Sequence, residues 1–311
     1  MNKKFAAIFS VVIVLVFIGY MIFDTTKSEG PDTASTEIEN EIYPDGNWEI
    51  TDEFKVKEGS LKAVSVSQSG IIYLGGDSFV SGYDSEYDQI WTLATEAPVT
   101  SLAWFGDTVY ASTIDMVIVI SKDGKLLTEW GPFEYNSIIT SVSANKSNVV
   151  FADAGNKTLY ILDKGGEVKR MVGRNDGQFI VPSPYFDVAL DPEGLIYVAN
   201  TGHRRLETRG NDGVTISYFG EAGTAPDAFC GCCNPAHFIK TKTGYITAEK
   251  GINRIKILGE SGEFIEFVSS NNDFTPSVPL DIASVDGNII YAANPFDSKL
   301  YVFKRKGPPA P

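Results

Sequence analysis

The stretch LIYVANTGHRRLETRGNDGVTISYFG, residues 195–220, contains an apolar strand, a polar turn, a second strand, a glycine-containing turn and a third strand. The same order recurs in residues 149–173 and 244–269. A repeat with a period near 40 residues is typical of a propeller or a solenoid. Solenoids of the leucine-rich or tetratricopeptide type need helices, and no segment after residue 23 has helical periodicity. The repeat therefore favours a propeller.

Three weaker copies of this unit occur at residues 71–93, 108–130 and 289–305. One further strand precedes each of the six copies, which gives four short strands in every repeat. Four strands at this spacing are what a propeller blade requires. The sequence thus predicts an all-β, six-bladed β-propeller over residues 47–306, followed by a short tail at 307–311.

The two ends of the repeat array complement each other. The last repeat stops at Lys306 without an outermost strand, whereas the segment NWEITDEFKV at 47–56 has no partner strand in its own repeat. Pairing them closes the ring and removes two free sheet edges. We therefore expect Trp48–Val56 to be the outer strand of blade six.

A family resemblance rests on the stretch GRNDGQFIVPSPYFDVALDPEGLIYVANTGHRRLETRGNDG, residues 173–213. It has G-Q-F before a proline, then D-V-A-L-D-P-E-G, I-Y-V-A-N and an arginine ahead of the next strand. It resembles an NHL repeat, and this resemblance implies the NHL type of six-bladed propeller. Arg205 and Arg254 occupy the arginine position in blades four and five. Residues 207–209 (Glu-Thr-Arg) are less apolar than in the family, so we expect that strand to face solvent or to bind.

Charge limits the partners. The chain has 26 basic and 40 acidic residues and a formal net charge of −14. Such a surface repels nucleic-acid phosphates and anionic lipid headgroups, so we expect no nucleic-acid partner. We expect a monomer that binds a protein or a small molecule at the channel face of the propeller.

The chain begins with an apolar segment. Residues 5–23 (FAAIFSVVIVLVFIGYMIF) would form a helix about 28 Å long, close to the thickness of a bilayer core. Residues 1–23 thus predict a signal anchor, although a cleaved signal peptide is the alternative; no A-x-A-like cleavage site follows. Lys3 and Lys4 place the N-terminus in the cytoplasm and the propeller in the periplasm or outside the cell. Polar residues 24–46 are typical of a flexible stalk.

One position of the repeat predicts a site at the channel mouth. Inner strands line the channel, so equivalent residues of different blades converge in space. Alignment puts Asp187, His237 and Asp281 at this position in blades four, five and six, where carboxylates and imidazole suit a metal ion or a cationic group. Alternatively, as in NHL repeats, the aspartates bond the neighbouring blade's backbone. Blades one to three have Ala63, Ser101 and Ser141 there.

All the cysteines lie in the segment FCGCCNPAHF, residues 229–238. Cys230, Cys232, Cys233 and His237 form a ligand set that suits copper or zinc. An oxidising compartment favours a disulfide instead, between Cys230 and Cys233 or between Cys232 and Cys233, which leaves one odd thiol. A redox-active thiol pair is the third interpretation.

Three functions remain open. The chain has no nucleophile–base signature and no phosphate loop, and its other histidine, His203, lies in a polar turn that we expect at the surface. With two histidines it cannot supply the three-histidine zinc site of the amidating lyases, which are also NHL-type propellers. This favours a non-enzymatic ligand-binding, protein-binding or scaffold module. The alternatives are a copper or zinc protein for copper handling or electron transfer, and a lactonase-like hydrolase with a metal ion on Asp187 and Asp281.

Overall fold

The structure is a computed structural model that describes residues 46–307, with the exception of 175, 232, 271–272 and 276–277. The predicted anchor at 5–23, residues 24–45 of the predicted stalk and residues 308–311 of the tail lie outside the described residues. Within the described part, none of the helical segments is long and apolar enough to cross a membrane.

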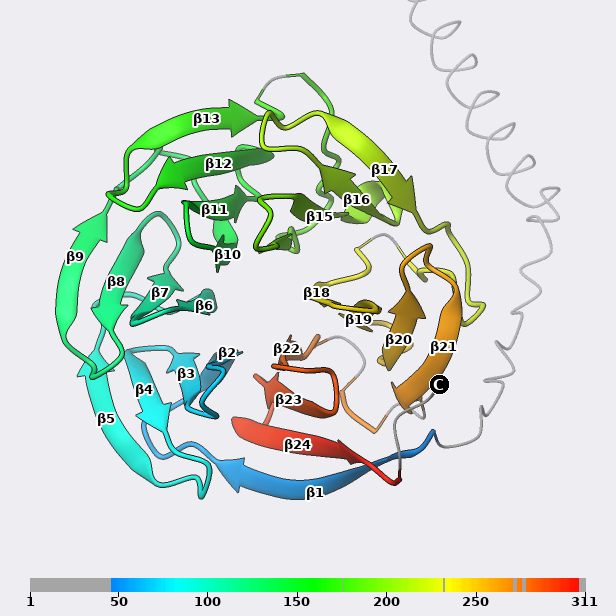
Figure 1. The fold of residues 1–311 in the computed structure, drawn as a ribbon, viewed down its shortest axis with the longest axis horizontal. Helices are drawn as coiled ribbons and strands as arrows, with labels where there is room; N and C mark the ends of the chain where they lie inside the picture. The colour runs from blue at the N-terminus through cyan, green and yellow to red at the C-terminus, as the bar shows by residue number, and fades with distance from the viewer. Residues whose placement is uncertain (1–45, 175, 232, 271–272, 276–277, 308–311) are drawn as a thin grey trace, which may run out of the picture. The chain divides into compact units, whose positions relative to one another are not determined.

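The described residues form six four-stranded antiparallel sheets around a central channel (Figure 1). The predicted all-β, six-bladed propeller is therefore confirmed. From the channel outward, the first three blades contain β2 (Leu61–Val66), β3 (Ile72–Gly76), β4 (Phe79–Tyr83) and β5 (Gln89–Ala94); β6 (Ser101–Phe105), β7 (Thr108–Ser112), β8 (Val117–Ser121) and β9 (Leu126–Trp130); and β10 (Ile139–Ala144), β11 (Asn148–Asp153), β12 (Thr158–Asp163) and β13 (Val168–Val172).

Blades four to six repeat the same order. They contain β14 (Val188–Leu190), β15 (Ile196–Asn200), β16 (Arg205–Arg209) and β17 (Thr215–Phe219); β18 (His237–Thr241), β19 (Gly244–Ala248), β20 (Ile255–Gly259) and β21 (Phe264–Ser269); and β22 (Asp281–Ala283), β23 (Ile289–Asn294), β24 (Lys299–Arg305) and β1 (Trp48–Lys55). A short 3-10 turn, η1 (Thr201–His203), links β15 to β16.

The first strand of the domain closes the ring. β1 pairs antiparallel with β24, with Trp48 opposite Arg305 and Lys55 opposite Lys299, as the unpaired ends of the sequence indicated. The Arg305 guanidinium lies 4.8 Å from the Trp48 ring, and Trp48 is buried. The closure removes the free edge that blade six would otherwise expose.

The core lies between the blades. Each of six apolar clusters joins two neighbouring blades; one joins Leu74 of blade one to Leu300 of blade six, and another joins Tyr110 of blade two to Phe151 of blade three. The middle strands are buried on both faces, whereas outer strands such as β9 and β17 are largely exposed. This packing fixes the inner strands and the side chains at their channel ends.

The polar strand of blade four differs from the expectation. Glu207 and Arg209 are buried and form an ion pair of 2.5 Å, and Arg205 reaches the same carboxylate at 2.7 Å. The expectation that this strand faces solvent is wrong. The strand has polar residues because a paired, hydrogen-bonded carboxylate replaces apolar packing between blades.

Candidate functional site

The inner strands present a ring of repeat-equivalent side chains at one end of the channel. In four blades this side chain accepts a hydrogen bond from a main-chain N–H of the next blade. The pairs are Val142 N to Ser101 Oγ (3.2 Å), Val188 N to Ser141 Oγ (3.1 Å), Phe238 N to Asp187 Oδ2 (2.7 Å) and Val64 N to Asp281 Oδ2 (2.8 Å). Asp187 and Asp281 therefore link neighbouring blades, which is the structural role that their position in the repeat suggested.

Blade five departs from this ring, because it contributes an imidazole. His237 Nδ1 lies 3.5 Å from Asp281 Oδ1 and 4.0 Å from Asp187 Oδ2. The exposed fraction of the side chain is 18% for His237, 16% for Asp281 and 11% for Asp187, so solvent reaches all three. We call Asp187, His237 and Asp281 the mouth triad.

The two carboxyl groups of the mouth triad are hard to ionise. The pKa of Asp281 is raised to about 6, chiefly by burial and to a lesser extent by the neighbouring Asp187 charge, while His237 and two main-chain N–H groups oppose the shift. Burial likewise raises the pKa of Asp187, against the opposing influence of His237 and of hydrogen bonds from Ser141 and two main-chain N–H groups. A positive charge placed beside them would stabilise the ionised forms of both.

Two further residues frame the mouth triad. The Tyr185 ring meets the His237 ring edge-on at a centroid distance of 6.4 Å, and Lys250 Nζ lies 4.2 Å from the Tyr185 centroid. Tyr185 stands two residues before Asp187, and Lys250 follows β19 in blade five. The sequence-based prediction missed both, because they lie in connecting segments just before an inner strand and just after the second strand of a blade.

Behind the mouth triad, the channel contains a cavity of about 270 Å³. Asp187 and Asp281 line it together with small polar side chains from several blades. These are Ser65, Ser101, Ser141, Ser143 and Ser284. The cavity thus offers hydrogen-bonding groups in a narrow space, which suits a slim polar group and excludes a bulky apolar one.

The cysteine loop folds against this end of the propeller. Cys230 and Cys233 are buried; the Cys230 thiol lies 3.7 Å from the Lys250 carbonyl oxygen, and Ser183 Oγ donates to Cys233 Sγ at 2.8 Å. Asn234 ties the loop to blade five, because its side-chain amide donates to the main-chain oxygens of Cys230 (2.8 Å) and Lys250 (2.7 Å). The loop is therefore held by protein hydrogen bonds.

The metal prediction concerns Cys230, Cys232, Cys233 and His237. Cys232 lies outside the described residues. Among the residues that are described, no group of three or more His, Cys, Asp and Glu side chains is arranged to hold a metal ion. The copper or zinc site stays a prediction, as do the disulfide and the redox-active pair.

A buried ionic cluster contacts the chain segment that leads into the cysteine loop. Glu249 pairs with Arg254 at 2.9 Å and with Lys256 at 2.8 Å, and Lys256 also donates to the Ala228 carbonyl oxygen at 2.6 Å. Burial lowers the pKa of Lys256 to about 8, and Glu249 opposes this shift. Arg254, the arginine that the NHL resemblance singled out, donates to three carbonyl oxygens of the segment before the cysteines.

Comparison with known proteins supports the fold. No protein-family model matches the chain, and no curated protein matches its sequence. Among solved structures it is similar to streptogramin B lyase, with a TM-score of 0.61 and 12% identity over 83% of this chain and 98% of that one. Virginiamycin B lyase from Staphylococcus aureus gives 0.58 and 13% over 83% and 99%. The WD40 β-propeller domain of Doa1 gives 0.58 and 12% over 80% of both chains. At such identities the likeness shows the propeller fold alone, and NHL membership stays a prediction.

Proposed function

We propose that this protein is a β-propeller binding module that takes a cationic, N–H-bearing group of a ligand or partner protein at the mouth triad. The observation that carries the proposal is the placement of His237 between Asp187 and Asp281, two partly accessible carboxyl groups with raised pKa values. A lysine or arginine side chain of a partner, or a small amine, has the required chemistry.

The proposal rests on the hydrogen-bonding capacity that the Asp281 carboxylate has left for a ligand. Asp281 Oδ1 accepts the Ile282 N–H and faces His237 Nδ1, whereas Oδ2 accepts only the Val64 N–H and retains a further lone pair for a ligand. A positive charge there offsets the cost of burying a carboxylate. The net charge of −14 attracts cationic partners over longer distances and speeds encounter.

The location belongs to the same proposal. The apolar run at residues 5–23 and the lysine pair before it support a single membrane anchor with a cytoplasmic N-terminus and an extracytoplasmic propeller. The repeat pattern of residues 173–213 supports placing the propeller in the NHL group. In this arrangement the module acts as a receptor or scaffold at the outer face of the membrane.

Metal binding by Cys230, Cys232, Cys233 and His237 is a second candidate function. It is favoured by the position of the cysteine loop. Ser183 donates a hydrogen bond to Cys233 and stands two residues before Tyr185, and the Tyr185 ring contacts the His237 ring. Copper or zinc analysis of the purified full-length chain, with and without His237→Ala, tests it. A lactonase-like hydrolase with a metal ion on Asp187 and Asp281 stays a hypothesis that the same analysis addresses.

An array of short peptides tests the binding proposal. Each peptide carries lysine at a fixed central position, and each has a twin in which uncharged norleucine of similar shape replaces lysine. We expect the full-length protein to retain lysine peptides and not their twins, and Asp281→Asn and Asp187→Asn to abolish retention. Ser101→Ala, at the equivalent position of blade two, serves as the control and retains binding. Equal binding of both peptide series, or full binding by Asp281→Asn, would refute the proposal.

A further inference from the structure

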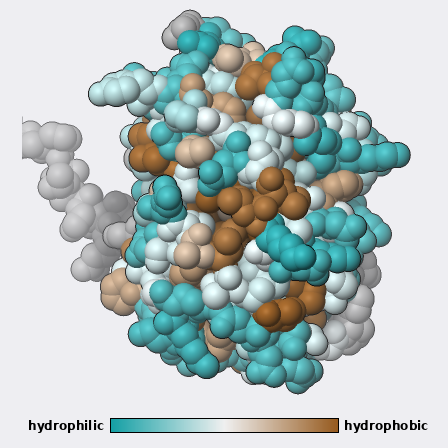
Figure 2. All heavy atoms as spheres, turned by 90° about the vertical axis from the view of Figure 1, so that its left-hand side faces the viewer, coloured by the Kyte–Doolittle hydropathy of each residue, from teal (hydrophilic) through white to brown (hydrophobic). Residues whose placement is uncertain are grey.

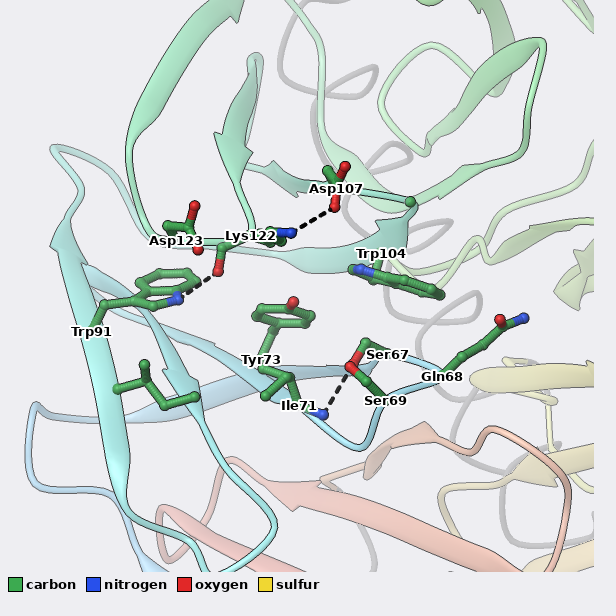
Figure 3. Close-up of a pocket in the computed structure, with 12 residues that line it drawn as sticks. Ser67, Gln68, Ser69, Ile71, Tyr73, Trp91, Trp104, Asp107, Lys122 and Asp123 are labelled. Carbon is green, nitrogen blue, oxygen red and sulfur yellow. Dashed lines mark hydrogen bonds and ion pairs between the residues drawn. The ribbon is translucent and has the colours of Figure 1, made fainter.

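A second cavity, of about 550 Å³, lies between blades one and two, at the opposite ends of the inner strands from the mouth triad. Three aromatic side chains line it: Tyr73 of β3, Trp91 of β5 and Trp104 of β6. Figure 3 shows Trp91 and Trp104 on opposite sides, with Tyr73 between them. Both tryptophans are half-buried, whereas Tyr73 is buried and forms the floor. We call this cavity the aromatic groove.

Comparison with the neighbouring pair of blades explains why the aromatic groove is open. Lys122 and Lys164 are equivalent, because each stands two residues before the turn glycine of its blade. Between blades two and three, Lys164 Nζ lies 4.6 Å from the Tyr110 centroid and 5.0 Å from the Phe105 centroid. Lys122 instead pairs with Asp107 at 3.1 Å (Figure 3). The Lys164 ammonium thus covers the aromatic rings between blades two and three, whereas the equivalent Lys122 ammonium pairs with Asp107 instead.

A lysine covers aromatic rings between blades four and five as well. Lys240 Nζ lies 5.0 Å from the Tyr245 centroid and 5.6 Å from the Tyr197 centroid. Tyr73, Tyr110 and Tyr197 occupy the same position of the repeat, whereas Tyr245 stands one residue before its equivalent, Ile246. Two other grooves therefore place an internal cation over this tyrosine, and the aromatic groove does not.

We propose that the aromatic groove binds an external organic cation bearing a quaternary ammonium group. Tryptophan faces attract cations most strongly of the aromatic side chains, and a quaternary ammonium needs no hydrogen-bond acceptor. Asp107 and Asp123 line the same cavity and outweigh the single Lys122 charge. The cavity exceeds the size of a trimethylammonium group, so the ligand carries a further moiety, and the two carboxylates disfavour a phosphate there.

Packing alone does not account for Trp91. The Trp91 ring lies across Gly124, which has a φ of +81°. A Cβ at Gly124 would lie only 2.5 Å from the Trp91 ring, so there is no room for one. Trp130 lies across Gly166 in the same way. Trp130 is buried, however, whereas Trp91 faces the cavity beside Ile90, which is 53% exposed. The aromatic groove reaches the outer strand β5, on the face where Figure 2 shows hydrophobic surface among hydrophilic surroundings.

Choline is the probe, and 3,3-dimethylbutanol, its uncharged isostere, is the matched control. Titration of the full-length protein, in a detergent without a choline headgroup, is followed by tryptophan fluorescence and calorimetry. We expect saturable choline binding with a Kd of about 1 mM or tighter, and at least about 10-fold weaker binding of the isostere. We expect phosphocholine to bind more weakly than choline, because its phosphate would lie near Asp107 and Asp123, and tighter binding of phosphocholine would contradict this argument.

Variants locate the site. Trp91→Ala and Trp104→Ala should abolish choline binding, and the surface change Asp123→Asn, which leaves packing intact, should weaken it about 3-fold. Asp212→Asn, the equivalent aspartate in blade four, and Asp281→Asn in the mouth triad should leave it unchanged, which separates this site from the proposed function. Absence of choline binding, equal binding of the isostere, or loss through Asp281→Asn rather than Trp91→Ala would overturn the proposal.

Discussion

His237 Nδ1 lies 3.5 Å from Asp281 Oδ1, although the two residues belong to neighbouring blades and are separated by 44 positions in the sequence. The repeat brings them together, since each occupies the channel end of an inner strand. Asp281 also accepts the Val64 N–H of blade one. The contact thus lies where blades five, six and one meet, and Asp281 links all three of them.

Stability should depend on pH through Asp281. Its pKa is raised from 3.8 to about 6, so the folded state binds the proton more tightly than the unfolded chain. The resulting stabilisation is fully present below pH 3.8 and is lost as pH rises through about 6. Urea unfolding across this range should show wild type losing stability relative to Asp281→Asn. A constant difference between the two proteins would contradict the raised pKa; Asp187, shifted in the same direction, leaves some dependence in the variant.

Asp187→Ala should destabilise the propeller. The change removes the acceptor of the Phe238 N–H, which is left unsatisfied, and one of the two acceptors of Ser141 Oγ, which keeps only the Val188 carbonyl oxygen at 3.3 Å. We expect a loss of about 1–3 kcal/mol per buried donor in the free energy of unfolding. Ser101→Ala, which removes one hydrogen bond at the equivalent position, is the control and should cost about 1 kcal/mol. Similar unfolding midpoints for the two variants would argue against an interblade role of Asp187.

Breaking the buried ionic cluster of blade five should lower the free energy of unfolding by more than Asp187→Ala does. Glu249→Gln leaves Arg254 and Lys256 buried without their carboxylate, and such a change typically costs about 3–5 kcal/mol. Lys256→Met should cost less, because it removes an ammonium whose pKa burial already lowers to about 8. Glu167→Gln, which affects an exposed pair with Lys169, is the control and should change stability by less than about 1 kcal/mol. Chemical denaturation measures all three.

The orientation of the chain is open to a direct test in cells. In the proposed arrangement Lys3 and Lys4 keep the N-terminus inside, so a protease added to intact cells, or to spheroplasts where an outer membrane is present, should digest the propeller. A cytoplasmic marker protein, which must survive until lysis, is the control. Protection of the propeller until lysis would reverse the orientation.

The sequence was sufficient to predict the architecture because the repeat is periodic. The segment 47–56 could be paired with the last strand of blade six from the unmatched ends of the array, and Asp187, His237 and Asp281 could be aligned because the blade imposes one geometry on equivalent positions. A fold of nearest-neighbour units converts sequence register into spatial proximity.

The features that break the repeat were not predictable in this way. Glu207 and Arg209 look like surface residues until the partner of each is known, since a charge is buried only where another side chain compensates it. At the aromatic groove Lys122 pairs with Asp107, a side-chain choice that no periodicity reveals. Tyr185 and Lys250 lie in connecting segments outside the strands, where alignment of the repeats places side chains poorly.

The central claim, that the mouth triad receives a cationic group, predicts a proton release. A cation beside Asp281 lowers its raised pKa, so binding near pH 6 must expel protons from the site. Calorimetric titration of the full-length protein with the tightest lysine peptide, in two buffers of different ionisation enthalpy, measures the number of protons released. We predict net release for wild type that is sharply reduced in Asp281→Asn; binding without release, or equal release from the variant, would contradict the claim.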